Sequence, residues 1–255
     1  MSVPVSNRIV RALAVIGFAV FSNLLAAAQS GAQGAEPGQC GVGQTKKCFV
    51  SLPVAFKPFH PSDQKRETKA DLKFYDTCGH GWLAPKGDWT DGASIPLLFQ
   101  GLIGNPWEAD YLPAAIVHDH YTDLKHLVRP WRDVVMVFRQ AMEARHIPVW
   151  KLKLMYYAVY TFGPHHDPNS AGQSCGPNCV FSTLPHDRTA QLPLSQKRGE
   201  LARVKKLILD SERNAKPLSF DDLERLAGQK HPELASSAGK LLQSFTRLGT
   251  CSILQ

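Results

Sequence analysis

The residues of this sequence best suited to chemistry fall in two short clusters. The first is the stretch 90–96 (TDGASIP), in which Asp91 and Ser94 offer a carboxylate and a hydroxyl; the second is His118-Asp119-His120. Such groups serve as general bases, nucleophiles and metal ligands. Between the clusters, residues 101–106 contain two glycines and an Asn-Pro pair, which predict a loop that brings the clusters together.

His118 is predicted to lie on the inner face of a helix. Three apolar residues share its face at helical spacing, namely Ala114, Val117 and Tyr121. A buried imidazole costs free energy unless its nitrogens find hydrogen-bond partners. Because consecutive residues of a helix point about 100° apart, Asp119 is poorly placed for this role. Asp91 is therefore the predicted partner of His118.

Three interpretations of these residues stay open. His118, oriented by Asp91, could act as a general base that activates water or Ser94. The same residues could instead form a buried polar lock between the sheet and the helices. Thirdly, Asp119 and His120 could hold a metal ion, with zinc suited to imidazole and calcium to carboxylate oxygen.

The elements that position these residues indicate an α+β fold. Residues 48–164 are predicted to form the main domain, which is a small N-terminal antiparallel sheet followed by a helical bundle. Alternating residues predict strands at 72–77 and 81–85, joined by a Gly79-His80-Gly81 turn. A further strand is predicted over 49–56, whereas 60–68 is polar and predicted to be a loop.

The helices of the bundle are predicted from apolar spacing and from their end signals. Asn105 and Pro106 have the form of a helix start, and Pro113 is expected to restart that helix as a segment over 113–125. The next two helices are predicted over 131–145 and 148–162, and Gly163-Pro164 stops the second. A C-terminal helical extension is expected over 191–255, with Ser219 capping one of its helices.

The N-terminus is predicted to be a signal peptide over residues 1–28. Arg8 and Arg11 precede an apolar run of about 17 residues and three alanines, which is the layout of a cleaved export signal. The run is shorter than the ~20 residues that span a bilayer, although an uncleaved membrane anchor is the alternative. The protein is therefore expected in the periplasm or secreted, with residues 29–47 as a flexible leader.

The six cysteines all follow the predicted cleavage point. An even number in an oxidising compartment predicts up to three disulfides, and Cys40 with Cys48 and Cys175 with Cys179 could each close a short loop. The last pair lies in a connector over 165–190 that is rich in Cys, Pro and Gly. At its start, His165-His166-Asp167 could bind a metal ion, but a solvated loop end is the favoured prediction because no spaced partner is evident.

The charge of the chain is concentrated near its C-terminus. The formal net charge is +7, and residues 191–255 hold 11 basic against 7 acidic residues. This basic tail is predicted to be a solvated helical surface that could make peripheral contact with a membrane. Nucleic acid is not expected as a partner, because an exported protein rarely meets it.

Taken together, these motifs resemble a family of bacterial and phage proteins catalogued as a domain of unknown function. The shared pattern is a strand, then T-D-x-A-S-I-P at 90–96, then A-x-x-x-H-D at 114–119. Phe138 in the next helix and M-Y-x-A-V-x-x-F-G at 155–163 complete it. The resemblance covers about residues 70–164, and it implies a shared fold and site without a defined activity.

The His-Asp pair on a helix is also similar to the core of secreted phospholipase A₂. That resemblance implies His118 as base and Asp119 as a calcium ligand, with an acid on the following helix that orients the histidine. This sequence departs from the pattern in two ways. The position expected for the orienting acid is Val135, while Asp133 points away from the stripe, and the usual glycine-rich calcium loop is absent.

Two functions from different classes follow from these features. The first is a hydrolase of envelope lipid or cell-wall polymer, in which His118, Asp91 and Ser94 are catalytic. The second is a non-catalytic envelope or binding module, whose His/Asp cluster is a structural polar lock. No motif in the sequence specifies the substrate, the metal, the disulfide connectivity or the oligomeric state.

Overall fold

The computed structural model describes residues 40, 46–60, 63–92, 101–105, 107–123, 126–166 and 192–234. The chain divides into two units, 1–38 and 39–255, and all the described residues belong to the second. The predicted signal peptide, Ser94 and the Cys175–Cys179 pair lie outside the described residues. Within the described ranges, no helix is both long and apolar enough to cross a membrane.

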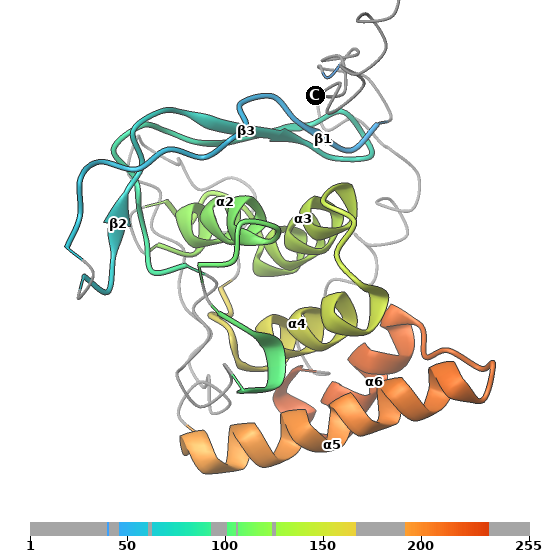
Figure 1. Cartoon of the computed structure of the whole chain (residues 1–255). Helices are drawn as coiled ribbons and strands as arrows, with labels where there is room; N and C mark the ends of the chain where they lie inside the picture. Colours follow the sequence, from blue (N-terminus) through green and yellow to red (C-terminus); the bar gives the residue numbers. More distant parts are fainter. Residues whose placement is uncertain are drawn as a thin grey trace, which may run out of the picture. The chain divides into compact units, whose positions relative to one another are not determined.

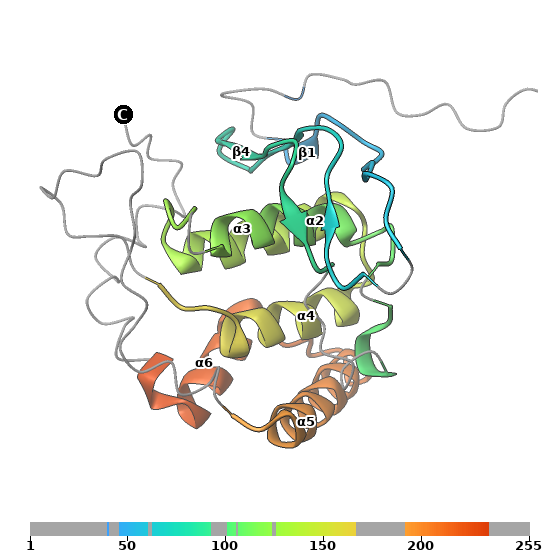
Figure 2. The same cartoon turned by 90° about the vertical axis from the view of Figure 1, so that its left-hand side faces the viewer.

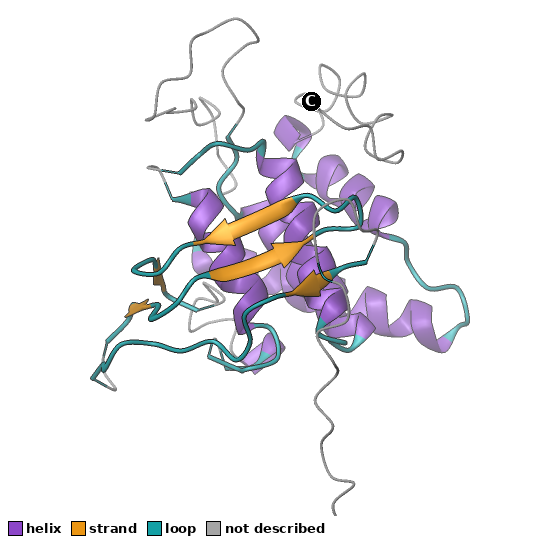
Figure 3. Ribbon diagram, turned by 90° about the horizontal axis from the view of Figure 1, so that it is seen from above, coloured by secondary structure: helices purple, strands orange, loops and turns teal. Residues whose placement is uncertain are grey.

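Two small antiparallel sheets form the N-terminal part of the fold. One has the strand order β1-β3-β4, with β1 at Cys48–Phe49, β3 at Leu72–Tyr75 and β4 at Gly81–Ala84 (Figure 3). The other pairs β2 (Arg66–Glu67) with β5 (Trp89–Thr90). The predicted hairpin of β3 and β4 is thus confirmed.

The first predicted strand and the predicted loop were both partly wrong. Pairing of the 49–56 segment ends after Phe49, and Phe56 makes only an isolated bridge to Thr68. The segment 60–68, predicted to be a loop from its polarity, contains β2. Its Arg66 guanidinium stacks 3.7 Å from the ring centroid of Phe59 and 3.8 Å from that of Trp107, so this charged strand residue packs against aromatic rings.

One buried carboxylate organises the turn between β3 and β4. Asp76 is 3 % exposed, and its Oδ1 accepts hydrogen bonds from the backbone N–H groups of Cys78 and His80. Its Oδ2 accepts the Trp82 indole N–H at 3.0 Å. Gly79 adopts a φ of 75°, which favours glycine, and the predicted turn follows from that conformation.

Three helices form the centre of the fold. They are α2 (Leu112–Thr122), α3 (Trp131–Ala144) and α4 (Val149–Phe162). The expected helix start at Asn105 is wrong: the Asn105 side chain accepts the Trp107 N–H at 2.9 Å, and turns continue to Tyr111. The stop of α4 at Gly163 is confirmed, and a Cβ there would lie 2.4 Å from the Val159 carbonyl oxygen.

The elements of the second unit lie in successive layers. The three-stranded sheet covers α2 and α3, and α4 packs on the other side of α3 (Figures 1 and 2). Beyond α4 lie α5 (Leu194–Arg213) and α6 (Phe220–Lys230), both in contact with α4. Ser219 caps α6 as predicted, through a reciprocal capping box with Asp222.

The C-terminal helices are joined to α4 by buried polar contacts as well as apolar ones. The Tyr157 hydroxyl donates to Glu200 Oε1 at 2.6 Å, and His231 Nε2 lies 3.0 Å from the same oxygen. Tyr156 donates in the same way to Glu224 of α6. The three tyrosines of α4 are core residues, and the hydroxyl groups of Tyr156 and Tyr157 bind acidic side chains of the C-terminal helices.

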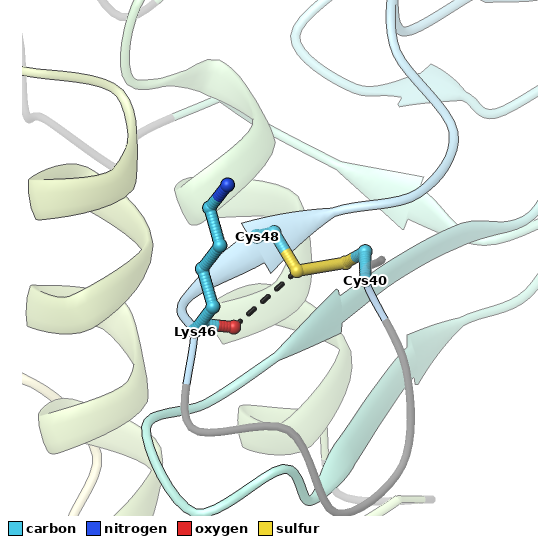
Figure 4. Close-up of a disulfide and its surroundings, with 3 residues drawn as sticks. All are labelled: Cys40, Lys46 and Cys48. Carbon is cyan, nitrogen blue, oxygen red and sulfur yellow. Dashed lines mark hydrogen bonds between the residues drawn. A yellow bond between two sulfur atoms is a disulfide. The ribbon is translucent and has the colours of Figure 1, made fainter. Parts of the chain in front are cut away.

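The cysteines that the structure describes are oxidised. Cys40 and Cys48 form the predicted disulfide, which fixes the chain just before the sheet (Figure 4). The sulfur of Cys48 lies 3.3 Å from the Lys46 carbonyl oxygen. Cys78 is disulfide-bonded as well.

Candidate functional site

The C-terminal turn of α2 meets the short strand β5 through Asp119. The Thr90 hydroxyl donates to Asp119 Oδ2 at 2.5 Å and accepts the backbone N–H of Gly92 at 3.0 Å. Thr90 is 2 % exposed, so this contact is inside the protein. Gly92 has a φ of 82°, which lets the chain turn back toward the threonine side chain.

His118 faces the interior, as its helical spacing predicted, and is 8 % exposed. Its ring lies against Phe138 of α3, with the ring centroids 5.2 Å apart. Its Nδ1 lies 3.6 Å from Asp119 Oδ1, slightly longer than a hydrogen bond. The sequence argument that Asp119 is poorly placed to face His118 was therefore wrong, because the two side chains curl toward each other from adjacent positions.

The other ring nitrogen of His118 has no hydrogen-bond partner among the described residues. Nε2 is buried, and no described donor or acceptor satisfies it. Buried polar atoms in native proteins are nearly always paired, so an unpaired one calls for an explanation such as a catalytic role, a bound water or an ion. Val135, which occupies the position of the orienting acid in the phospholipase pattern, is buried on α3.

The carboxylate of Asp119 is held in an unusual electrostatic environment. Burial raises its pKa above the usual range, and the negative charge of Asp91 acts in the same direction. The neighbouring His118 and the Thr90 hydrogen bond oppose that rise. Asp91 is itself exposed, yet it is close enough to influence Asp119. The exposed carboxylate of Asp91 thus adds negative charge next to the buried pair of His118 and Asp119.

His120, the second residue predicted to bind metal, belongs to a different cluster from Asp119. Its Nδ1 lies 2.5 Å from Asp88 Oδ2, and its ring stacks on His126 with centroids 4.4 Å apart. One possible ligand atom from each of Asp88, His120 and His126 lies within 4.8 Å of the others. The predicted ligand pair of Asp119 and His120 is therefore divided between two neighbouring clusters.

A second group of potential ligands, Asp76 with Cys78 and His80, is less suited to a metal. One possible ligand atom from each of these three residues also lies within 4.8 Å of the others. However, the sulfur of Cys78 is in a disulfide, so no thiolate is available. Both oxygens of Asp76 already accept hydrogen bonds that hold the turn.

Three further titratable residues are buried or partly buried: Asp133, His165 and His166. Burial raises the pKa of Asp133 on α3 to about 6, with the nearby Asp76 acting in the same direction and Arg129 and His80 opposing. His165 and His166, predicted to be solvated, are instead 2 % and 1 % exposed. Trp131 packs on His165 and donates its backbone N–H to the His166 carbonyl, which explains their burial.

His166 also lies in the electrostatic neighbourhood of His118. Burial lowers its pKa, and the charge on His118 contributes to that lowering. Its Nε2 bonds the Arg129 carbonyl oxygen at 2.8 Å, whereas its buried Nδ1 has no partner among the described residues. The sequence analysis placed His166 in a solvated loop end, whereas its contacts with Arg129 and Trp131 hold it inside the protein.

Among the predicted residues, His118 and Asp119 come together, with Asp91 close to Asp119, while His120 faces Asp88. Ser94 lies outside the described residues. Sequence reasoning missed Thr90, Asp88 and His126. Asp88 lies directly before β5, Thr90 lies two positions later in it, and His126 follows α2, but neither spacing is specific enough to identify a site without the fold.

A separate hollow of about 390 Å³ lies between α5 and α6. Apolar and charged residues line it, among them Leu207, Leu218, Asp222 and Arg225. It contains none of the predicted site residues, and it does not bear on the chemistry of His118.

Sequence comparisons bear on this geometry. The profile of a family described as "Protein of unknown function (DUF1353)" matches residues 67–159, which include Asp88, Thr90 and the whole of α2. Uncharacterized protein y4iH of Sinorhizobium fredii is 40% identical over 171 residues, covering 65% of this chain and 71% of that protein. The chain belongs to the DUF1353 family.

A second relative shares a shorter region with this DUF1353 protein. Uncharacterized protein y4jT of the same organism is 42% identical over 98 residues, which are 38% of this chain and 29% of that protein. No solved structure matches the chain. The family assignment therefore rests on sequence, and the site must be interpreted from its own geometry.

Proposed function

We propose that this DUF1353 protein is an exported hydrolase of envelope material in which His118 is the general base. The observation that carries the proposal is the imidazole itself. Nδ1 faces a buried carboxylate at 3.6 Å, and the buried Nε2 has no partner among the described residues. A histidine oriented at one nitrogen and unpaired at the other has a nitrogen left to accept a proton.

The chemistry follows from that arrangement. With Nδ1–H directed at Asp119, the lone pair of Nε2 accepts a proton from water as the water oxygen attacks an ester carbonyl carbon; where Ser94 attacks instead, water then hydrolyses the acyl-serine in a second round of the same proton transfers. The proton then passes to the leaving alcohol as the ester C–O bond breaks. Asp119 stabilises the imidazolium that forms between these steps, and Thr90 holds Asp119 in place. Asp91 acts on the same pair through its charge.

Two features support export and contact with lipid. The cysteines that the structure describes are disulfide-bonded, which suits an oxidising compartment. The exposed face of α5 carries a basic set with apolar neighbours, namely Arg198, Arg203, Lys206, Leu194 and Leu207. Cationic and apolar side chains together favour an anionic lipid surface, so a lipid ester is the first substrate to test.

The test uses the full chain with its disulfides intact. Fatty-acid release is measured from vesicles of phosphatidylglycerol and phosphatidylethanolamine, and peptidoglycan is assayed in parallel. His118→Gln should abolish the activity, since glutamine keeps the polarity and approximate size but cannot act as a base near neutral pH. The matched control is His146→Asn, because His146 is exposed and its φ of 54° is one that asparagine tolerates.

A second function, a non-catalytic module with a polar lock, is favoured by one observation. The Thr90–Asp119 hydrogen bond joins β5 to α2 inside the protein. A lock predicts that the wild-type chain releases nothing from either substrate and that His118→Gln only lowers stability. A catalytic site predicts loss of activity at an unchanged melting temperature, so the two measurements on one variant separate the functions.

A further inference from the structure

We infer that Asp88, His120 and His126 form a zinc site at the junction of β5 and α2. The three residues come from separate pieces of the chain. Asp88 directly precedes β5, His120 lies in the last turn of α2, and His126 follows that helix. This site is independent of the proposed hydrolase, because it uses none of the residues assigned to proton transfer.

The distances suit a small cation. One ligand atom from each residue lies within 4.8 Å of the others, and Asp88 Oδ2 to His120 Nδ1 is 2.5 Å. Four ligands arranged tetrahedrally around zinc at bond lengths of about 2.1 Å stand about 3.4 Å apart. The separation between Asp88 Oδ2 and His120 Nδ1 must therefore open by about 1 Å, and no other separation has to close by more than about 1.4 Å, which rotation of the side chains can supply.

The types of ligand distinguish zinc from calcium. Two imidazoles and one carboxylate form the kind of three-residue set that binds catalytic zinc and leaves a fourth position for water. Calcium instead takes six to eight oxygen ligands, whereas this set offers nitrogen from two of its three members. Iron(II) uses a similar set, but zinc binds a given site more tightly in the usual order of divalent metals.

The stacking of His120 on His126 is the second observation. The two rings are 4.4 Å apart at an interplanar angle of 20°, and both lie beside the same carboxylate. All three residues are only partly exposed, with His120 and Asp88 side chains at 11% and 15%. The imidazoles of His120 and His126 and the carboxylate of Asp88 thus lie together, and a bound cation would be coordinated by all three.

Zinc at this position would add a further link between two elements, β5 and α2, that already contact each other. β5 has only two residues, and Thr90 in it bonds Asp119 of α2, while Asp88 directly before the strand pairs with His120. Because zinc binds the folded arrangement and not the unfolded chain, adding it should raise the melting temperature, and above the dissociation constant the stabilisation should grow with the logarithm of the free zinc concentration.

The experiment is zinc titration of the full chain, first stripped with a chelator under conditions that keep the disulfides. Isothermal titration calorimetry should show one zinc per chain, and the melting temperature should rise as zinc is added. His126→Phe keeps a ring for stacking but removes the ligand, so affinity should fall by more than about a hundredfold, given that even outer partners of a metal contribute ten- to a hundredfold. Asp88→Asn should also weaken binding.

Three controls make the result decisive. His146→Asn should bind zinc like the wild type, because it removes an exposed histidine elsewhere. If stripped His126→Phe melts well below the stripped wild type, His126→Asn replaces it. Cobalt(II) should give the visible absorption of a tetrahedral site, and His126→Phe should lose it. Absence of stoichiometric zinc, tighter binding of calcium than zinc, or full binding by both His126 variants would overturn the inference.

Discussion

Replacement of Thr90 by valine tests the contact that holds the candidate site together. Thr90→Val preserves the shape of a side chain that is 2 % exposed and removes only its hydroxyl. The hydroxyl donates to Asp119 and accepts from Gly92 N–H. Both partners stay in place after the substitution, so the carboxylate loses a donor and the amide loses an acceptor.

The expected cost can be worked out from these two bonds. A hydrogen bond to a charged group contributes about 1.5–3 kcal/mol, and a bond between neutral groups about 0.5–1.5 kcal/mol. The added methyl of valine offsets part of the loss by staying buried. We therefore expect Thr90→Val to lower the free energy of unfolding by about 1–4 kcal/mol.

The cost should also depend on pH. The Thr90 hydrogen bond lowers the pKa of Asp119, so it favours the ionised carboxylate. Without that bond, the folded protein binds a proton at Asp119 more readily, and protonation recovers part of the lost stability. The difference between wild type and Thr90→Val should accordingly be larger at pH 8 than at pH 4.5.

The assay is urea unfolding of the full chain followed by circular dichroism, with Thr90→Ser as the matched control. Serine keeps the hydroxyl and loses one methyl group, which costs about 0.8 kcal/mol. A double-mutant cycle with Asp119→Asn measures the coupling between the two side chains, expected to exceed about 1 kcal/mol. If Thr90→Val costs no more than Thr90→Ser, or the coupling is zero, the proposed contact between β5 and α2 does not stabilise the protein.

Two further predictions concern buried acids. Because burial raises the pKa of Asp133 to about 6, the folded protein should lose stability as pH rises from about 4 to about 6. Asp133→Asn should remove that pH dependence and raise the free energy of unfolding at pH 7 by up to about 3 kcal/mol, measured by thermal unfolding. An unchanged pH profile in the variant would contradict this. For Glu200, burial raises the pKa, but hydrogen bonds from Tyr157 and His231 with the charge of Lys230 outweigh it and give a net lowering. Glu200→Ala should cost about 3–5 kcal/mol at pH 7 and less as pH falls below about 4, and an equal cost at both pH values would argue against the buried network.

The helices were predictable because their signals are local. The position of His118 on an inner face follows from apolar spacing along α2, and Gly163 ends α4 because only a residue without a Cβ fits beside the Val159 carbonyl. Ser219 was recognised as a cap from its residue type. In each case the interaction that decides the structure spans fewer than about five residues.

The partners of the candidate site were less predictable because they are distant in sequence. Thr90 meets Asp119 across 29 positions, and Asp88 meets His120 across 32. β2 was missed because its residues are charged, and its Arg66 is accommodated by aromatic rings that come from elsewhere in the chain. The burial of His165 and His166 was not predicted, because it depends on Trp131 of α3, which contacts both residues.

The end of α2 is where the polar lock and the catalytic hypothesis meet. Its three consecutive polar residues face different neighbours: His118 packs on Phe138 of α3, Asp119 bonds Thr90, and His120 pairs with Asp88. One turn of helix thus connects the sheet to the bundle, and the same contacts set the orientation of the imidazole. A truncation here would disturb the fold and any chemistry together. Variants that keep shape and remove one polar group, such as His118→Gln and Thr90→Val, are needed because they let stability and activity change separately.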